Sequence, residues 1–115
     1  MPEAVNGTTR IHYDTKGDRN DPSILLINGY TQPMTSFMDG FCQLLVDAGY
    51  HVIRFDNRDV GLTSKTQGDP PDLQGIITAV MANQTLPQVP YTLEDMAADA
   101  FAVLDAASIT SAHIV

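Results

Sequence analysis

A run of aliphatic residues, Ser23-Ile24-Leu25-Leu26-Ile27-Asn28-Gly29, gives the clearest indication of the fold, because it stands between a polar loop and a turn signal. A strand that is apolar on both sides must be covered on both sides, as strands of parallel sheets are. Parallel strands in turn require crossover connections, which are usually helical. We therefore predict an α/β domain with Ser23–Ile27 as a buried strand.

The segment after this strand has the pattern of a helix. Ser36 is expected to cap it, with Asp39 at the third helical position. Apolar residues then recur at helical spacing, namely Phe37, Phe41, Leu44, Leu45 and Ala48. Gly49 ends the helix with a residue that tolerates the left-handed conformation. Because His51–Phe55 is the next apolar strand, Ser23–Phe55 predicts one right-handed β-α-β unit.

Two further segments complete the predicted sheet. Asn6-Gly7 is a hairpin signal, since a type I′ turn requires positive φ at both central residues. Pro2–Val5 and Thr8–Tyr13 should flank this turn as strands, with His12 on a solvated face. Ala112–Val115 is expected to be the third parallel strand. The predicted fold class is therefore three-layer α/β, with a mostly parallel sheet preceded by an antiparallel hairpin.

Two more helices are predicted between His51–Phe55 and the last strand. The first is short and amphipathic, with Leu73, Ile76, Ile77, Val80 and Met81 at helical spacing. We interpret its role as packing, and the alternative is a wall of a ligand pocket. The second begins at Thr92, where Asp95 completes a capping box and Tyr91 and Met96 occupy the positions of a hydrophobic staple. Its apolar face is predicted to comprise Leu93, Met96, Ala97, Ala100, Phe101 and Leu104.

Composition limits the classes of function. The 115 residues are 43% hydrophobic and 17% charged, which suffices for the core of one domain. A net charge of −8, from 6 basic and 14 acidic residues, argues against binding nucleic acid or a membrane surface. No apolar run approaches the ~20 residues of a membrane span, and Met1–Ala4 lacks the layout of a signal peptide. We expect a cytoplasmic protein, with the single cysteine, Cys42, as an inert core residue.

Three segments together resemble the opening half of an α/β-hydrolase, and within that superfamily the small bacterial esterases related to aclacinomycin methylesterases. They are the strand ending in Asn28-Gly29, the turn Asp56-x-Arg58-x-x-Gly61-x-x-Ser64, and the helix opening Pro90-Tyr91-Thr92-Leu93-x-Asp95-Met96-Ala97-x-Asp99. In that family the strand matching Ala112–Val115 runs into the G-x-S-x-G turn of the nucleophilic serine. The resemblance implies that residues 1–115 are a single incomplete domain, the N-terminal part of a serine hydrolase that cleaves carboxylic esters through an acyl-enzyme.

The resemblance also implies part of an oxyanion hole after the first parallel strand. The backbone N–H of Tyr30 would donate to the negative charge that develops on a carbonyl oxygen, and Gly29 would let the chain turn tightly. Asn28 stands where the family often has histidine. Ser108 stands where relatives typically have glycine, and a left-handed conformation there would cost about 1 kcal/mol.

The segment Asp56-Asn57-Arg58-Asp59-Val60-Gly61 admits more than one interpretation. By resemblance Asp56 and Arg58 would tie the turn down near the oxyanion loop, and Gly61 would relax it. Two carboxylates and a guanidinium at a strand end also fit a metal site, although no paired His or Cys spacing accompanies them. A non-enzymatic binding or receiver-like signalling domain with Asp56 as phospho-acceptor is the alternative function. The chain lacks the acidic pair that a receiver-like domain would carry after its first parallel strand.

No residue of the chain is assigned a catalytic role. His12, His51 and His113 all precede the position of the nucleophile, whereas the family's acid and histidine follow it. The serines at 23, 36, 64, 108 and 111 lack a G-x-S-x-G setting. We therefore expect the triad downstream of Val115, no cofactor and no metal. The expected partners are an ester-like small molecule and the missing half of the domain, without which the chain should be inactive and poorly soluble or partly ordered.

Overall fold

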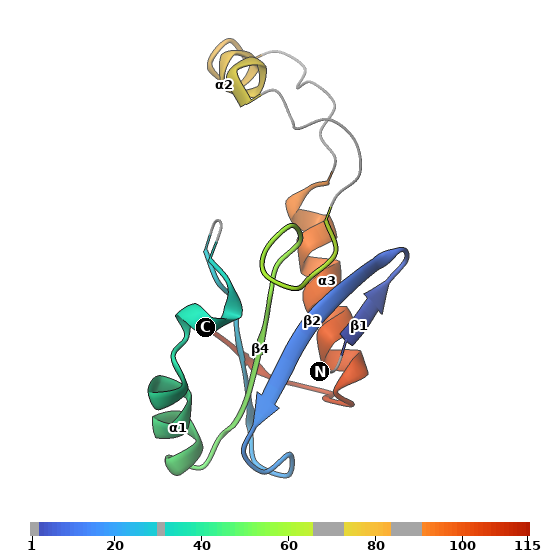
Figure 1. Cartoon of the computed structure of the whole chain (residues 1–115). Coiled ribbons are helices and arrows are strands. Elements are labelled where there is room, and N and C mark those ends of the chain that lie inside the picture. Colours follow the sequence, from blue (N-terminus) through green and yellow to red (C-terminus); the bar gives the residue numbers. More distant parts are fainter. Residues whose placement is uncertain (1–2, 30–31, 66–72, 84–90) are drawn as a thin grey trace.

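The computed structural model describes residues 3–29, 32–65, 73–83 and 91–115. Five strands form one sheet in the order β1-β2-β4-β3-β5 (Figure 1). The strands are β1 (Glu3–Asn6), β2 (Thr9–Lys16), β3 (Ser23–Leu26), β4 (His51–Phe55) and β5 (His113–Ile114). The helices are α1 (Asp39–Asp47), α2 (Leu73–Met81), α3 (Leu93–Ala106) and a 3-10 turn, η1 (Met34–Ser36).

The sheet is mixed. β3 pairs in parallel with β4 on one side and with β5 on the other, while β1 with β2 and β2 with β4 are antiparallel. The Val115 amide donates to the Leu25 carbonyl at 3.0 Å, and the Ile27 amide donates to the Val115 carbonyl at 2.8 Å. The prediction that Ala112–Val115 lies beside Ser23–Ile27 is therefore confirmed, whereas the antiparallel pairing of β2 with β4 was not predicted.

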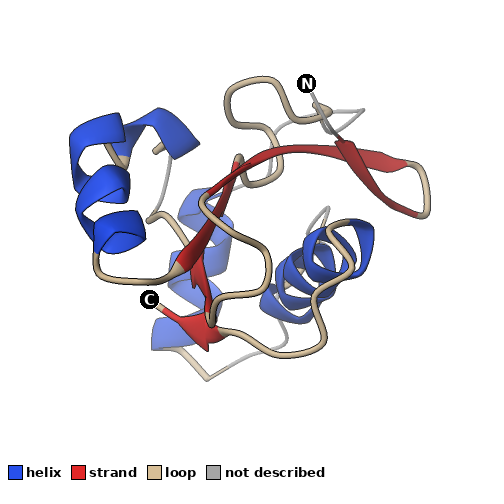
Figure 2. Ribbon diagram, turned by 90° about the horizontal axis from the view of Figure 1, so that it is seen from below, coloured by secondary structure: helices blue, strands red, loops and turns tan. Residues whose placement is uncertain are grey.

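Helices cover both faces of the sheet, as Figure 2 shows. Alternate residues of β3 and β4 point to opposite faces and pack into two separate apolar clusters. One cluster contains Leu25, Ile53 and Phe55 and packs against Val103 of α3. The other contains Ile24, Leu26 and Val52 and packs against Cys42 of α1. The three-layer α/β class predicted from the aliphatic run is confirmed.

The start of α1 differs from the prediction. The helix begins at Asp39 with Met38 as N-cap, and Ser36 lies in η1, where its hydroxyl donates to Gln32 Oε1 at 2.7 Å. Phe37 is extended, and its carbonyl accepts a hydrogen bond from Arg54 Nη1 at 2.6 Å. Because that carbonyl is bound to the sheet, the segment before Asp39 does not join the helix. The capping role predicted for Ser36 is wrong.

The buried faces of α1 and α3 also differ in part. Leu44 on α1 and both Leu93 and Phe101 on α3 are exposed, and the side chains buried in their place are Cys42, Asp99 and Val103. The capping box of Thr92 and Asp95 is confirmed. Periodicity located these helices correctly. It also predicted that more of their apolar side chains would be buried than the structure buries among the described residues.

The hairpin turn and His12 correct two details. Asn6 pairs with Thr9, and Gly7, with φ of 63°, is the one residue of the turn with positive φ. The turn therefore has glycine at its first central position, as type II′ turns do, and is not type I′. His12 is buried because the segment after β4 covers β2, where the His12 amide donates to Thr63 Oγ1 at 2.9 Å. The solvated position predicted for His12 is wrong.

The helix α2 lies where the spacing predicted it, and Figure 1 shows it standing apart from the sheet. Its apolar side chains Ile77, Val80 and Met81 are exposed. Ala79 of the same helix is buried, and the packing role that we expected stays a prediction. None of the helices in the described ranges combines the length and the apolar character needed to cross a membrane.

Candidate active site

The carboxyl ends of β3 and β4 open onto a cavity of about 950 Å³. Ligands of open α/β sheets bind at this end of the strands, because the loops that follow neighbouring strands converge there. The loop after β3, the loop after β4 and the first turns of α3 supply the wall. Its lining includes Asn28, Gly29, Asn57, Arg58, Asp59, Val60, Gly61, Tyr91, Leu93, Met96, Ala97 and Ala100.

Asp56 joins the two loops that border this cavity. Its Oδ1 accepts a hydrogen bond from the Met34 amide at 2.7 Å, and its Oδ2 accepts one from the Leu62 amide at 3.0 Å. The side chain is buried, and its backbone carbonyl accepts the Thr63 hydroxyl at 2.7 Å. Amide donors directed at an ionised carboxylate are among the stronger hydrogen bonds in proteins. One carboxylate therefore fixes the loop after β3 against the loop after β4.

Gly61 allows the approach of that carboxylate. Its φ is 55°, and a Cβ atom at this position would lie 2.5 Å from the Asp56 Cγ. No side chain fits in that space, and the positive φ adds strain for any residue except glycine. The tight turn around Asp56 therefore depends on Gly61.

The loop after β3 is held by its own side chains. Asn28 Nδ2 donates to the Pro33 carbonyl at 2.9 Å, which closes the loop, and Asn57 Nδ2 donates to the Asn28 carbonyl at 3.3 Å. Gly29 lines the cavity. Tyr30, the residue to which the resemblance assigns the oxyanion donor, lies outside the described residues.

Arg58 reaches α3 and not the loop after β3. Its Nε and Nη2 donate to the two carboxylate oxygens of Asp99, at 2.6 and 3.0 Å, and Asn6 Nδ2 donates to Asp99 Oδ1 at 2.7 Å. Asp99 is 2% exposed. The hydrogen bond to Asp99 raises the pKa of Arg58 further above its ordinary value. The Arg58 guanidinium carbon also lies 5.4 Å from the centre of the Tyr91 ring.

Asp99 belongs to the helix motif of the sequence, but the motif alone predicted no role for it. The available signal was its position among Ala97, Ala98 and Ala100, where a charge within an apolar stretch requires a partner. A second cluster was missed entirely. Arg54, buried on the α1 face, donates from Nε to Asp14 at 2.8 Å and from Nη2 to Asp39 at 2.9 Å.

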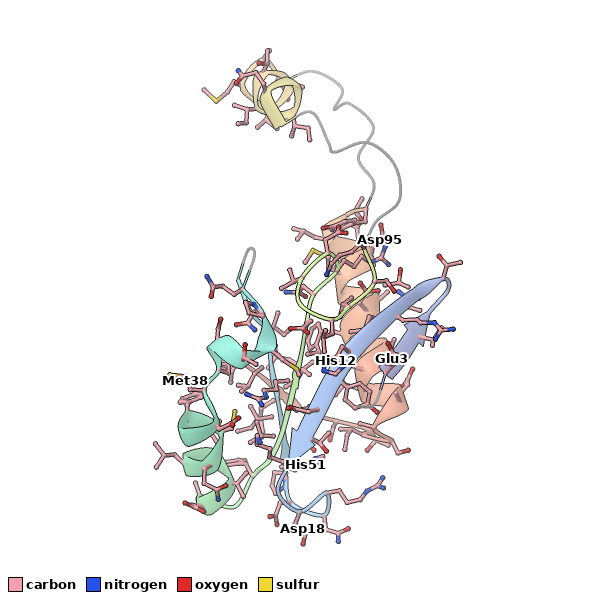
Figure 3. All side chains as sticks on the ribbon, in the orientation of Figure 1. Glu3, His12, Asp18, Met38, His51 and Asp95 are labelled. Atoms are coloured by element: carbon pink, nitrogen blue, oxygen red, sulfur yellow. The ribbon has the colours of Figure 1, made fainter. Side chains whose placement is uncertain are left out.

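None of the three histidines is among the described residues that line the cavity. Ser23 Oγ and His51 Nδ1 share a hydrogen bond of 3.1 Å at the amino end of the parallel strands. Burial lowers the pKa of His51, and the positive charge of Arg19 adds to the effect. Figure 3 shows His51 at the opposite end of the sheet from Asp95 and the start of α3. Among the described residues no three His, Cys, Asp or Glu side chains gather as a metal site.

The sequence of this chain is similar to those of known methylesterases. A rhodomycin D methylesterase from Streptomyces peucetius is 35% identical over 99 residues, which are 86% of this chain and 27% of that relative. A second rhodomycin D methylesterase, from Streptomyces sp. (strain C5), is 34% identical over the same number of residues, 99. No family model matches the chain.

Solved structures agree on the fold. The enol-lactonase of Burkholderia xenovorans superposes with a TM-score of 0.70 at 23% identity, over 98% of this chain and 35% of the other. Epoxide hydrolase A of Mycobacterium thermoresistibile gives a TM-score of 0.69 at 26% identity, over 98% of this chain and 29% of the other. The chain belongs to the α/β-hydrolase superfamily. It spans 27% of the length of the methylesterases that it matches.

Proposed function

We propose that this chain supplies the first part of a carboxylic-ester hydrolase that works through an acyl-enzyme, with the cavity beside β3 and β4 as its substrate site. The observation that carries the proposal is the Asp56 carboxylate, which locks the two loops at the carboxyl ends of these strands. A rigid loop at this point serves acyl transfer, because donors that are already in place stabilise the developing oxyanion most effectively. The methylesterase relatives support ester cleavage as the reaction class.

In this proposal the oxyanion donor is the backbone N–H of Tyr30. Gly29 lines the cavity, but its φ is not left-handed and a Cβ atom there would meet no other atom within 4 Å, so the turn does not require glycine. Asn28 and Asp56 hold the two ends of the loop through Pro33 and Met34. Loss of one such donor costs about 100-fold to 1000-fold in rate. The substrate is an ester-like small molecule.

The proposal assigns the nucleophile, acid and base to residues that this chain does not contain. β5 lies at the edge of the sheet, and Ile114 and Val115 are exposed there. An apolar edge strand invites pairing with another strand. We therefore place the remaining part of the hydrolase against β5, and we expect the 115-residue chain alone to be inactive.

We also propose a cytoplasmic location. Cys42 is the single cysteine of the chain, and it is free and buried. A protein of this composition has no need of an oxidising compartment, because it forms no internal disulfide.

The receiver-like alternative finds no support at Asp56. A phospho-acceptor needs a carboxylate oxygen that a phosphoryl donor can reach. Asp56 is 3% exposed, and both of its oxygens accept backbone amides. The geometry favours a carboxylate that fixes loops.

The test is a hybrid enzyme in which residues 1–115 replace the matching part of the Streptomyces peucetius methylesterase. We expect the hybrid to hydrolyse p-nitrophenyl acetate and to react with a fluorophosphonate, while residues 1–115 alone do neither. Tyr30→Pro, which removes the backbone donor, should lower kcat by about 100-fold or more, whereas Tyr30→Ala keeps the donor and should stay within about threefold. A folded hybrid in which both variants lose activity equally would overturn the role of the Tyr30 amide.

A further inference from the structure

Arg58 and Tyr91 meet at the wall of the cavity, in a contact that the proposed catalysis does not use. Both residues line the cavity, and the Arg58 guanidinium carbon lies 5.4 Å from the centre of the Tyr91 ring. A guanidinium within about 6 Å of a ring centre attracts the negative face of the ring. The ring therefore has a partner that limits its orientation.

Arg58 itself is fixed from behind. Two of its nitrogens bind the two carboxylate oxygens of Asp99, and Asp99 receives a third hydrogen bond from Asn6. If Arg58 turned toward a ligand, it would leave the buried carboxylate of Asp99 without its counter-charge, which is strongly unfavourable. Arg58 therefore stays with Asp99, with its guanidinium carbon 5.4 Å from the centre of the Tyr91 ring.

This arrangement bears on the charge that the cavity accepts, together with Asp59, an acidic residue that also lines it. Of the described residues that line it, Arg58 is the one with a cationic side chain, and that charge is matched by Asp99. The nearby wall is apolar, comprising Val60, Leu93, Met96, Ala97 and Ala100. A carboxylate that entered would lose hydration and find no uncompensated cation among these side chains. An uncharged aromatic or aliphatic group would lose nothing comparable.

We propose that Tyr91 is a specificity-determining residue of this cavity and that Arg58, anchored by Asp99, is the residue that positions its ring. The pair selects ligands whose group at this wall is uncharged and apolar over ligands that carry a carboxylate there. This inference rests on the proposed function for the location of the substrate site. Its test requires binding alone, so it can fail while ester hydrolysis by the hybrid enzyme succeeds, and the reverse also holds.

The test uses two matched probes, methyl 9-anthroate, which is neutral, and 9-anthroate, its anion, titrated with the 115-residue chain and followed by probe anisotropy. We expect the neutral ester to bind about tenfold or more tightly than the anion, because the site offers no free cation. Tyr91→Ala and Tyr91→Leu should each weaken the ester about fivefold, and Tyr91→Phe should stay within about twofold because it keeps the ring. Leu44→Ala, an exposed truncation on α1, is the control for an unspecific loss of apolar surface.

Positioning by Arg58 needs its own measurement. The chain has no tryptophan, so Tyr91→Trp places a single reporter at this wall. The pair Arg58→Gln and Asp99→Asn, made together, removes both charges without leaving either one unpaired. We expect this pair to lower the anisotropy of Trp at position 91 and to weaken the neutral ester about threefold, while far-UV circular dichroism is unchanged.

Three results would overturn the proposal. They are tighter binding of the anion than of the ester, no saturable binding of the ester by the unaltered chain, and equal ester affinity in Tyr91→Ala and the unaltered chain. An unchanged reporter anisotropy in the double variant would remove Arg58 from the mechanism.

Discussion

The two ends of the parallel strands are held together in different ways. At the carboxyl end, Asp56 and the Arg58–Asp99 pair use full charges with several partners each. At the amino end, Ser23 and His51 share one hydrogen bond of 3.1 Å, and the connection that leads into β5 passes through Ser108. Of the two ends, the carboxyl end, where the loops border the cavity, therefore has the charged interactions. The amino end has one neutral hydrogen bond and a residue, Ser108, in the left-handed conformation.

The largest effect is expected at the carboxyl end, from Arg58→Leu. The change leaves Asp99, which is 2% exposed, without its counter-charge. Removing one partner of a buried ion pair lowers the free energy of unfolding by about 3 to 5 kcal/mol. Urea denaturation of the variant would measure this loss. Arg10→Leu is the control. Arg10 is exposed, and its Nη1 lies 3.9 Å from Glu3 Oε1 in a surface ion pair.

Replacing both members of the Arg58–Asp99 pair distinguishes the cost of an unpaired charge from the cost of changed packing. Arg58→Leu combined with Asp99→Leu should recover most of the loss, because no charge then remains unpaired. A single variant as stable as the Arg10→Leu control would mean that the two ends do not differ in the way described above.

Asp56→Asn is the next largest change. The asparagine side chain keeps one acceptor oxygen. Its NH₂ group then faces one of the two backbone N–H groups that donate hydrogen bonds to Asp56. Leaving such a buried donor unsatisfied costs about 1 to 3 kcal/mol, seen as a lower urea midpoint. Asp18→Asn offers the matched comparison, because the Asp18 carboxylate is at the surface and accepts one amide, from Asn20, at 2.9 Å. Equal midpoints for the two variants would contradict the importance of the Asp56 bridge.

At the amino end a substitution should stabilise the protein. Ser108 has φ of 59°, a conformation that costs a non-glycine residue about 1 kcal/mol. Ser108→Gly should therefore raise the free energy of unfolding by up to that amount, measured by the same urea titration. Ser111→Gly, in the same connection, controls for added flexibility and should be neutral or slightly destabilising. A loss of stability in Ser108→Gly would refute the assignment of strain to this residue.

Much of this arrangement could be predicted from the sequence where one local signal was sufficient. The apolar strands, the Thr92–Asp95 capping box and the left-handed Ser108 each follow from a few neighbouring residues. The failures required contacts across the fold. Ser36 did not cap α1 because Arg54 binds the Phe37 carbonyl, and His12 is covered by a segment some fifty residues further along the chain.

The candidate site divides in the same way. Gly29, Asp56, Arg58 and Gly61 could be selected from motif spacing, and the structure places all four at or beside the cavity. The partner of Arg58 could not be deduced, because Asp99 is 41 positions away in the chain. Motif spacing in the sequence therefore identifies residues of a site. Contacts between elements far apart in the chain determine which of these residues bind one another.

The smallest effect expected is a pH dependence at the amino end, from His51. Burial lowers the pKa of His51 below its ordinary value of 6.5, so the unfolded chain binds this proton more readily than the folded one. Stability from this residue is therefore complete above pH 6.5 and falls as the pH drops below it. His51→Gln should reduce the loss of unfolding free energy between pH 7.5 and pH 5.5. His113→Gln, which replaces an exposed histidine, is the control. An identical pH dependence in the His51→Gln variant and the unaltered chain would show that the Ser23–His51 pair does not contribute to acid sensitivity.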